Sequence, residues 1–377
     1  MARPLSNPRP LRIDGSDFPE TLREDALRLM QDPAPARALT KLLLRAGKDV
    51  TLLERARAAV ALRAAAPTDR MIWAATDDLV YTQVPTWHWP MLEDLDRAQA
   101  YQVAISAAVG PGMQVLEIGA GTGLLAMMAA KAGAEHVYTV EANPLMADVA
   151  RACVARNGLS DQITVINGHS SQLEIGVHLP RRADTLIHEI FSSSVVTEGL
   201  VPSLVHAKAE LLAPGATLLP EAVDIMTALS EDLDDAEAQW WWVGGFDLSP
   251  LAVIDAAAHG VPGTRKRRRL SAPVLATTVD LHNPALNHER FHHLTLHADT
   301  SGVVAGVSQW MNIRFPCGKT LCSDTPRSHW GACFHPLAAH KTVSPGDAVR
   351  IDVGLGAARL AIGLSPDALD DGWERGL

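Results

Sequence analysis

The stretch HEIFSSSVVTEG, residues 188–199, holds two glutamates, Glu189 and Glu198, among apolar and hydroxyl side chains. Their separation of nine residues is about two and a half helical turns at ~3.6 residues per turn, so a helix would point the two side chains in opposite directions. An odd separation also divides them between the two faces of a strand. Only a loop that doubles back brings both carboxylates to one place.

A second stretch, VLEIGAGTG at residues 115–123, ends an apolar strand and opens a helix. Glycine lets the backbone turn tightly and approach a ligand that a side chain would block. The order is GxGxG, and the position where a dinucleotide-binding GxGxxG motif needs its third glycine is Leu124. This spacing is the one found where S-adenosyl-L-methionine, which has no pyrophosphate, lies across the strand ends. The predicted cofactor-binding residues in this loop are Glu117, Gly119, Gly121 and Gly123.

An acidic residue, Glu141, ends the next apolar strand and is placed to accept both ribose hydroxyls, as in related folds. The glycines alone also fit a tight strand-to-helix turn that binds no ligand. Glycine loop and Glu141 together predict S-adenosyl-L-methionine as the cofactor.

With that methyl donor, two converging carboxylates suit a guanidinium acceptor. A guanidinium is planar, stays protonated (pKa above ~12) and binds carboxylates through paired hydrogen bonds. The donor is a sulfonium cation, so two carboxylates offset the like-charge repulsion and fix the acceptor. In-line positioning of the two reacting atoms supplies much of the remaining barrier reduction. Two solvated loop carboxylates remain the alternative interpretation.

Strand-like and helical segments alternate from about residue 98, which predicts a parallel, doubly wound sheet. Helical periodicity over residues 17–66 predicts a helical block with a cap at Asp49 or Thr51, for packing or dimerisation. After about residue 222 the pattern becomes strand-like, with a more helical excursion at WWWVGGFDLSPLAVIDAAAHG. The expected strands are 113–120, 136–142, 162–168 and 183–190 in the first sheet, and 272–281, 290–299, 302–315 and 348–355 in the second domain.

The bulk composition excludes several classes. A net charge of −10 disfavours nucleic-acid binding, and the run RKRRR at 265–269 is interpreted as an exposed loop tip. No apolar run approaches the ~18–20 residues of a membrane span, and no secretion signal is seen. Four cysteines without metal or disulfide spacing indicate reduced thiols in a cytoplasmic protein. The histidine-rich stretch 282–297 has no carboxylates at ligand spacing, so no metal is expected.

These stretches together resemble the arginine N-methyltransferase family, from about residue 79 to the C-terminus and most densely over 113–202. Residues 124–170 resemble the branch of protein arginine methyltransferases that makes mainly monomethylarginine. Bacterial enzymes that methylate free L-arginine on the route to streptozotocin are further relatives. The resemblance implies a Rossmann-like methyltransferase domain (71–222) and a β-barrel domain (223–377), and the helical region that precedes them (1–70) is not part of the family's common core. It also implies a homodimer formed through an arm at about 235–270.

The resemblance implies functions for the residues of this chain that match the family's motifs. HWPMLEDLDR resembles the cofactor lid, which implies contacts of His88 and Met91 with cofactor or substrate and a bidentate contact of Arg97 with the methionine carboxylate. GHSSQ resembles the adenine-edge loop, with Ser170 as candidate. RSHWGACFHPL resembles the family's THW loop, so His329 would support the glutamates and Trp330 would wall the acceptor pocket. The implied catalytic residues are Glu189, Glu198 and His329, and the implied substrate-binding residues are Tyr81, Met91 and Trp330.

Two departures bear on the acceptor. His188 replaces a residue that is usually small, and the lid keeps Tyr81 without the family's usual pair of tyrosines. Free L-arginine is slightly favoured because the chain is compact, rich in Ala and Arg and carries the extra helical block. Arg181 or Arg182, just before the fourth strand, is then a candidate for its α-carboxylate, although a solvated loop position is favoured for both residues. Peptidyl arginine is the alternative acceptor. A non-catalytic cofactor-binding scaffold and a dehydrogenase are the rival classes, disfavoured by the intact glutamates and by Leu124 respectively.

Overall fold

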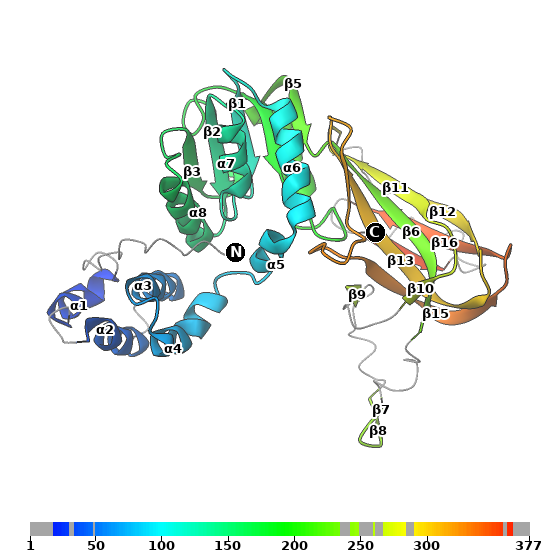
Figure 1. The fold of residues 1–377 in the computed structure, drawn as a ribbon, viewed down its shortest axis with the longest axis horizontal. Helices are drawn as coiled ribbons and strands as arrows, with labels where there is room; N and C mark the ends of the chain where they lie inside the picture. The colour runs from blue at the N-terminus through cyan, green and yellow to red at the C-terminus, as the bar shows by residue number, and fades with distance from the viewer. Residues whose placement is uncertain are drawn as a thin grey trace, which may run out of the picture.

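The computed structural model describes residues 18–29, 34–47, 50–233, 242–248, 259–260, 267–283, 290–356 and 360–364. Three parts follow one another along the chain: a block of short helices, a parallel sheet covered by helices, and an antiparallel β domain (Figure 1). The predicted Rossmann-like domain followed by a barrel-like β domain is confirmed, and so is the helical extension.

The parallel sheet has the strand order β3-β2-β1-β4-β5. The chain runs outward from β1 through β2 to β3, then returns to pair β4 with β1, so the order reverses between β1 and β4. Ligands of open α/β sheets bind at the carboxyl ends beside such a reversal. The strands are β1 (Gln114–Ile118), β2 (His136–Glu141), β3 (Ile163–Asn167), β4 (Ala183–His188) and β5 (Leu212–Leu219).

Helices cover this sheet because the strands are apolar on both faces; every residue of β1 is buried. The sequence analysis did not identify β5 or the short helix before it. The elements packed around the sheet are α5 (His88–Glu93), α6 (Leu95–Ala108), α7 (Leu124–Lys131), α8 (Pro144–Arg156), η3 (Ser170–Gln172), α9 (Leu200–His206) and η4 (Ala207–Leu211).

The β domain is built on two long central strands, β6 and β13, which pair with each other. One sheet has the order β10-β6-β13-β15-β9, with β11 paired to β6 and β14 to β13; the other is β12-β16-β17. Its strands are β6 (Ala222–Asp232), β9 (His259–Gly260), β10 (Arg267–Arg269), β11 (Val274–Asp280), β12 (Arg290–His297), β13 (Gly302–Arg314), β14 (Thr320–Cys322), β15 (Cys333–Val343), β16 (Ala348–Leu355) and β17 (Leu360–Leu364).

One hydrophobic core runs from the parallel sheet into the β domain. At the junction the ring of Tyr101, on α6, meets Phe315 edge to face with centroids 5.0 Å apart. Because the two domains share this core, side chains from the β domain can be held against the cofactor end of the parallel sheet.

The N-terminal block has its own small core of eight buried residues, Leu62 and Ile72 among them. Thr51 caps α3 and forms a capping box with Glu54. Arg57 reaches Asp148 on α8 at 2.7 Å, which ties the block to the methyltransferase domain. The elements are η2 (Glu20–Leu22), α1 (Arg23–Leu29), α2 (Pro35–Leu44), α3 (Leu52–Ala65) and α4 (Arg70–Tyr81).

Two expectations about the arm region are wrong for its described residues. Instead of a helical excursion, β7 (Trp242–Val243) and β8 (Phe246–Asp247) form a hairpin. Its turn residues Gly244 and Gly245 have φ of 60° and 87°, which a two-residue hairpin turn requires. Arg267–Arg269 are strand β10 paired with β6 rather than a loop tip. Of the predicted arm at 235–270, residues 235–241, 249–258 and 261–266 lie outside the described residues.

Candidate active site

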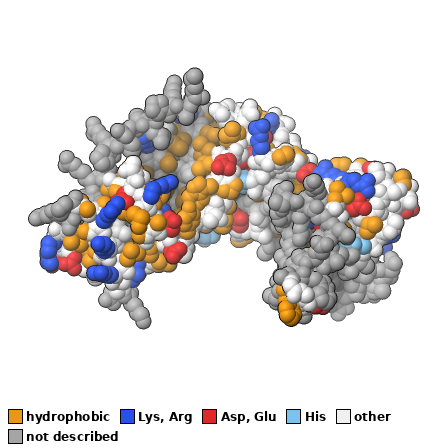
Figure 2. All heavy atoms as spheres, turned by 60° about the horizontal axis from the view of Figure 1, so that its bottom comes forward, with side chains coloured by type: hydrophobic (Ala, Val, Ile, Leu, Met, Phe, Trp, Pro, Cys, Tyr) orange, Lys and Arg blue, Asp and Glu red, His pale blue; other side chains and the backbone are white. Residues whose placement is uncertain are grey.

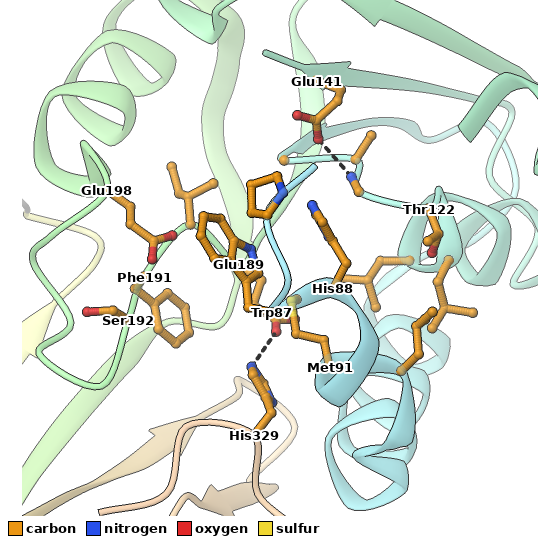
Figure 3. A pocket seen from close by; sticks show the side chains of 18 of the residues that line it. Trp87, His88, Met91, Thr122, Glu141, Glu189, Phe191, Ser192, Glu198 and His329 are labelled. Carbon is orange, nitrogen blue, oxygen red and sulfur yellow. Dashed lines mark hydrogen bonds and ion pairs between the residues drawn. The ribbon is translucent and has the colours of Figure 1, made fainter. Parts of the chain in front are cut away.

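A cavity of about 480 Å³ lies at the carboxyl ends of β1, β2 and β4, closed on one side by α5 and on another by a loop of the β domain (Figure 3). Eleven of the predicted site residues line it, although they come from segments more than 200 positions apart in the sequence. These are His88, Met91, Arg97, Glu117, Gly119, Gly121, Glu141, Glu189, Glu198, His329 and Trp330.

The glycine loop bends by left-handed backbone conformations. Gly119, Gly121 and Gly123 have φ of 87°, 52° and 78°, values that side-chain-bearing residues rarely adopt. Gly121 donates its N–H to one oxygen of Glu141 at 2.9 Å, and Asn143 donates to the other at 2.8 Å. Burial raises the pKa of Glu141, while these backbone hydrogen bonds oppose the rise. The carboxylate is thus held at the rim with lone pairs left for hydroxyl donors.

Glu117 is buried beside the same cavity, and one of its carboxyl oxygens has no hydrogen-bond partner in the described part of the chain. Its side chain accepts a hydrogen bond from the Thr139 hydroxyl at 2.5 Å. The other oxygen, Oε1, has no hydrogen-bond partner within the described ranges. Burial raises the pKa of Glu117 to about 8. A buried carboxyl oxygen that faces a cavity without a partner can accept a hydrogen bond from a ligand's ammonium group. The glycine loop, Glu141 and Glu117 together therefore fit S-adenosyl-L-methionine, which carries such a group.

The two glutamates of the opening stretch reach the cavity by the fold-back that their spacing required. Glu189 follows the last residue of β4, and Glu198 precedes the first turn of α9. Val195 and Glu198 have φ of 61° and 63°, conformations uncommon outside glycine that often accompany functional sites. Burial, and then the nearby charge of Glu189, raises the pKa of Glu198. The loop therefore gathers two like charges at one place.

Arg97 forms a buried bidentate ion pair with Glu189. Its Nε lies 2.6 Å from Oε1 and its Nη2 lies 2.5 Å from Oε2, and the side chains are 5% and 3% exposed. Burial disfavours the charge, but the adjacent Glu189 raises the pKa of Arg97. The resemblance had implied a contact with the cofactor's carboxylate. That role stays a prediction, and the structure adds the glutamate as a partner.

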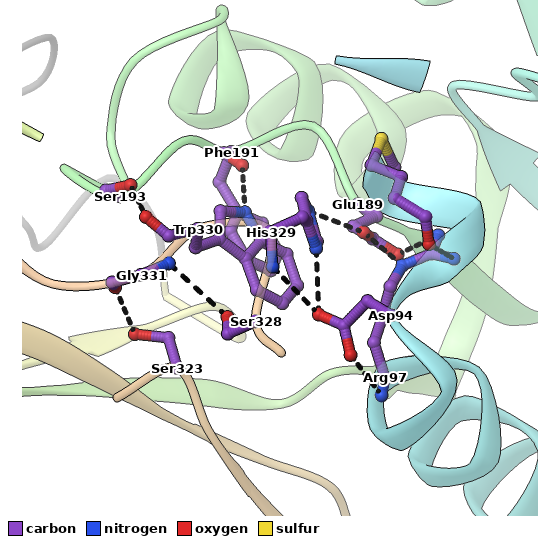
Figure 4. Close-up of polar contacts among 11 residues, drawn as sticks. Asp94, Arg97, Glu189, Phe191, Ser193, Ser323, Ser328, His329, Trp330 and Gly331 are labelled. Carbon is purple, nitrogen blue, oxygen red and sulfur yellow. Dashed lines mark hydrogen bonds and ion pairs between the residues drawn. The ribbon is translucent and has the colours of Figure 1, made fainter. Parts of the chain in front are cut away.

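His329 is held by Asp94, a residue that the sequence analysis did not assign to the site (Figure 4). Asp94 Oδ2 lies 3.0 Å from Nδ1 of His329 and accepts its backbone N–H at 3.1 Å. The opposite ring nitrogen, Nε2, lies 3.8 Å from Glu189 Oε1. Burial lowers the pKa of His329, with Asp94 opposing the shift. The signal for Asp94 in the sequence was only that of an acidic residue capping α6, where it accepts the Arg97 N–H at 2.9 Å.

Trp330 belongs to a rigid wall of the cavity. Its ring stacks on Phe191 with centroids 5.5 Å apart and planes 11° from parallel. Its indole N–H donates to the Phe191 carbonyl at 3.2 Å, and the Ser193 hydroxyl donates to the Trp330 carbonyl at 2.8 Å. This wall joins the glutamate loop to the β domain.

Three predicted residues do not line the cavity. Tyr81 is 53% exposed and packs on Trp89, with centroids 6.2 Å apart. Ser170 is buried in η3, and Gly123 caps α7. Their predicted roles remain predictions. The cavity is also lined by residues that the sequence analysis did not assign, including Trp87, Thr122, Asn143, Phe191 and Ser192.

The proposed carboxylate-binding role of Arg181 or Arg182 is wrong. Both precede β4, whereas Glu189 follows it, so they lie at the opposite end of the strand. Arg181 pairs with Asp184 and Glu135, at 2.7 and 3.2 Å. His188 is fully buried behind the site, and burial lowers its pKa to about 4, so the ring is neutral at pH 7.

The described part of the chain has neither a metal-binding cluster nor a membrane-spanning helix. No group of three or more His, Cys, Asp or Glu side chains there could hold a metal ion. None of its helices is long and apolar enough to cross a membrane.

Comparison with known proteins agrees with this geometry. Residues 99–244 match the family model described as ribosomal protein L11 methyltransferase (PrmA). The chain is 36% identical to arginine N(omega)-methyltransferase of Streptomyces achromogenes subsp. streptozoticus, over 72% of this chain and 76% of that protein. It is 31% identical to protein arginine N-methyltransferase 7 of Danio rerio, over 70% of this chain but only 43% of that protein.

Solved structures show the same fold at low sequence identity. A Trypanosoma brucei PRMT1 enzyme–prozyme complex with AdoHcy matches with a TM-score of 0.62, 22% identity, and coverage of 75% of this chain and 88% of that one. Arabidopsis thaliana protein arginine methyltransferase 10 matches with a TM-score of 0.58 and 21% identity, over 72% of this chain and 88% of that one. The fold and cofactor site are those of an S-adenosyl-L-methionine-dependent methyltransferase. Within that class, the chain belongs to the arginine N-methyltransferase family.

Proposed function

We propose that this enzyme transfers a methyl group from S-adenosyl-L-methionine to a guanidino nitrogen of arginine, with free L-arginine slightly favoured as the acceptor. The observation that supports it most is the convergence of Glu189 and Glu198 on the cavity that also holds the glycine loop and Glu141. Two carboxylates in one partly buried place need a cation, and a guanidinium matches them in charge and planarity.

The cofactor supplies an electrophilic methyl group, and the protein's own residues do the rest. Glu189 and Glu198 orient the guanidinium and offset its repulsion with a sulfonium. Asp94 receives the Nδ1–H of His329, which leaves Nε2 as the ring atom able to accept a proton beside Glu189. Phe191 and Trp330 form an apolar wall that excludes water from this side.

Support for the two possible acceptors differs. The name of the Streptomyces relative, 36% identical, specifies arginine itself. The relatives named protein arginine N-methyltransferase 7 are about 30% identical, and the chain matches less than half of their length. Peptidyl arginine is therefore the alternative acceptor.

One experiment separates the acceptors. The enzyme is incubated with isotope-labelled cofactor and either free L-arginine or an arginine-rich peptide, and methylated products are measured by mass spectrometry. Label on free arginine with a higher kcat/KM supports the proposal. A strong preference for the peptide supports the alternative, and label on neither removes both.

Three further proposals concern the whole chain. The enzyme is a homodimer, supported by exposed apolar residues both on the arm hairpin, where Phe246 is 71% exposed, and on the helices near the lid, where Met71 and Leu95 are 68% and 63% exposed. It works in the cytoplasm, supported by four free cysteines. Its domains divide near residues 70 and 222; the start of β6 at Ala222 supports the second boundary, whereas Ile72 on α4 packs in the core of the helical block and favours a first boundary closer to Tyr81.

A further inference from the structure

Trp87 stands at the mouth of the cavity with an uncovered ring. It is 54% exposed although it lines the cavity. Its backbone is fixed, because Trp87 opens α5 in a helical conformation and its carbonyl accepts the Met91 N–H at 3.2 Å. Its indole N–H makes no hydrogen bond to the described part of the chain. The indole ring at the mouth of the cavity is therefore available to contact a ligand that enters the cavity.

The ring lies on the acceptor side of the lid rather than over the cofactor loop. A methyl group built on Gly121 would come within 3.8 Å of the His88 ring, so His88 is the lid residue nearest the glycine loop. No atom of Trp87 lies within 4 Å of that methyl group, and the Trp87 ring centroid lies 5.9 Å from that of His88. In the view of Figure 3, Trp87 stands between His88 and Phe191, beside Glu189.

Elsewhere the protein pairs tryptophan faces with guanidinium groups. Arg269 lies 4.1 Å from the ring centroid of Trp310, and Arg63 lies 5.0 Å from that of Trp73. Trp87 has no such arginine among the residues that the structure describes. The cavity is lined by four glutamates and one arginine, Arg97, which already pairs with Glu189. The excess of carboxyl groups and the free aromatic face of Trp87 therefore favour a cationic ligand in the cavity.

We propose that Trp87 is a binding residue for the acceptor, whose guanidinium it covers by a cation–π contact while Glu189 and Glu198 hold its edges. The alkyl chain of the acceptor then leaves past the exposed rim of the indole. This proposal rests on the proposed function, because it needs a guanidinium acceptor.

The test uses four variants of the full chain. Trp87→Ala removes the ring, Trp87→Phe keeps a smaller aromatic face, and Trp87→Leu keeps apolar surface without a π system. Trp89→Ala is the matched control, since Trp89 is 50% exposed, lies two residues away on α5 and does not line the cavity. Steady-state kinetics with the preferred acceptor are combined with calorimetric binding of adenosylhomocysteine and light-scattering measurement of oligomeric state.

The expected result is an increase in acceptor KM of about tenfold for Trp87→Ala and Trp87→Leu, and of less than about threefold for Trp87→Phe. The kcat, the adenosylhomocysteine affinity and the oligomeric state should stay close to wild type in all four proteins, and Trp89→Ala should keep its KM. L-citrulline, the neutral isostere of arginine, should inhibit wild type and Trp87→Ala equally.

Other outcomes overturn the proposal. Equal KM values for Trp87→Phe and Trp87→Leu would show an apolar contact only, and weakened adenosylhomocysteine binding would place the ring on the cofactor. A change in oligomeric state as the sole effect would place it in a subunit contact. A wild-type enzyme that methylates neither arginine nor peptide would refute the proposed function itself, which these variant comparisons do not test.

Discussion

At the scale of single residues, Glu189 already binds the chemical group that the proposed acceptor carries. The Arg97 guanidinium sits on it in a two-pronged geometry at 2.5 and 2.6 Å. Each carboxylate oxygen has two lone pairs, so this pair uses one edge and leaves capacity on the other. The acceptor must then share Glu189 with Arg97 and depend on Glu198 for its second anion.

Replacing Glu198 tests that dependence most cleanly. Glu198→Gln keeps the shape but removes the charge, and we expect kcat to fall about a hundredfold or more, in the range for losing one preorganised electrostatic contact. Adenosylhomocysteine affinity, measured by calorimetry, should stay within a few-fold of wild type. Glu189→Gln should also abolish transfer, but it leaves the buried Arg97 unpaired and needs a stability control.

Glu141→Ala should behave differently from the glutamine variants: its cofactor affinity should fall, because the carboxylate proposed to bind the ribose is lost. Retained turnover in both glutamine variants would show that Glu189 and Glu198 do not hold the acceptor. Unchanged cofactor affinity in Glu141→Ala would show that Glu141 does not bind the ribose.

Glu117 predicts a pH dependence of stability. Its pKa is about 8 in the folded protein because of burial, against an ordinary value of 4.5. Between these values the folded state binds a proton that the unfolded state releases, so the free energy of unfolding falls as pH rises, by at most ~1.4 kcal/mol per pH unit. Thermal midpoints at pH 5 and pH 8 should differ less in Glu117→Gln than in wild type. The same pH dependence in both proteins would contradict the assignment.

At the scale of elements, Asp94 joins three of them, since it ends α5 and contacts both α6 and the loop that carries His329. One oxygen caps α6, and the other holds the backbone and ring of His329 on the loop from the β domain. Asn can keep the cap through its carbonyl oxygen but cannot accept the His329 N–H groups with its amide nitrogen.

The two substitutions at Asp94 should therefore differ. Asp94→Asn should lose most activity with a modest loss of stability, whereas Asp94→Ala should lose about 1 kcal/mol more through the missing cap. Chemical denaturation and kcat on the same samples check this order. Full activity in Asp94→Asn would show that the His329 contact is dispensable.

The elements also show what the sequence could and could not predict. The glycine loop, Glu141 and the glutamate loop were predictable because local spacing and residue type determine their place at strand ends. The Arg97–Glu189 and Asp94–His329 pairs were not, since they join side chains 92 and 235 positions apart. The first pair depends on how α6 lies against the end of β4, and the second on how the two domains pack. The arm hairpin was misassigned because its strands, with two residues each, are too short to show the alternation that indicates a strand, so only the Gly244-Gly245 turn marked it. Tyr81 stays apart from the cavity because it ends α4 facing solvent.

At the scale of the whole molecule, the distribution of apolar surface argues for a second copy of the chain. Hydrophobic side chains are spread over the face of the molecule shown in Figure 2, between the helical block and the β domain. The arm hairpin projects away from the rest of the chain (Figure 1), and Phe246 begins β8 directly after its turn. Exposed apolar patches of this kind mark association sites, and a projecting arm can reach a partner where it cannot reach its own body.

The proposed dimer can be tested by introducing one charged residue on each of the two proposed contact surfaces. Phe246→Asp on the arm and Leu95→Asp near the lid should each convert a dimer to a monomer in light scattering, because a carboxylate cannot be desolvated in an apolar contact without a partner. Val177→Asp is the matched control, since Val177 is 72% exposed and lies in a turn between η3 and β4, on neither the arm nor the lid helices. A monomeric wild type, or dimers that survive both substitutions at micromolar concentration, would exclude this interface. If the monomeric variants also lose cofactor affinity, then the subunit contact positions the α5 lid over the cavity.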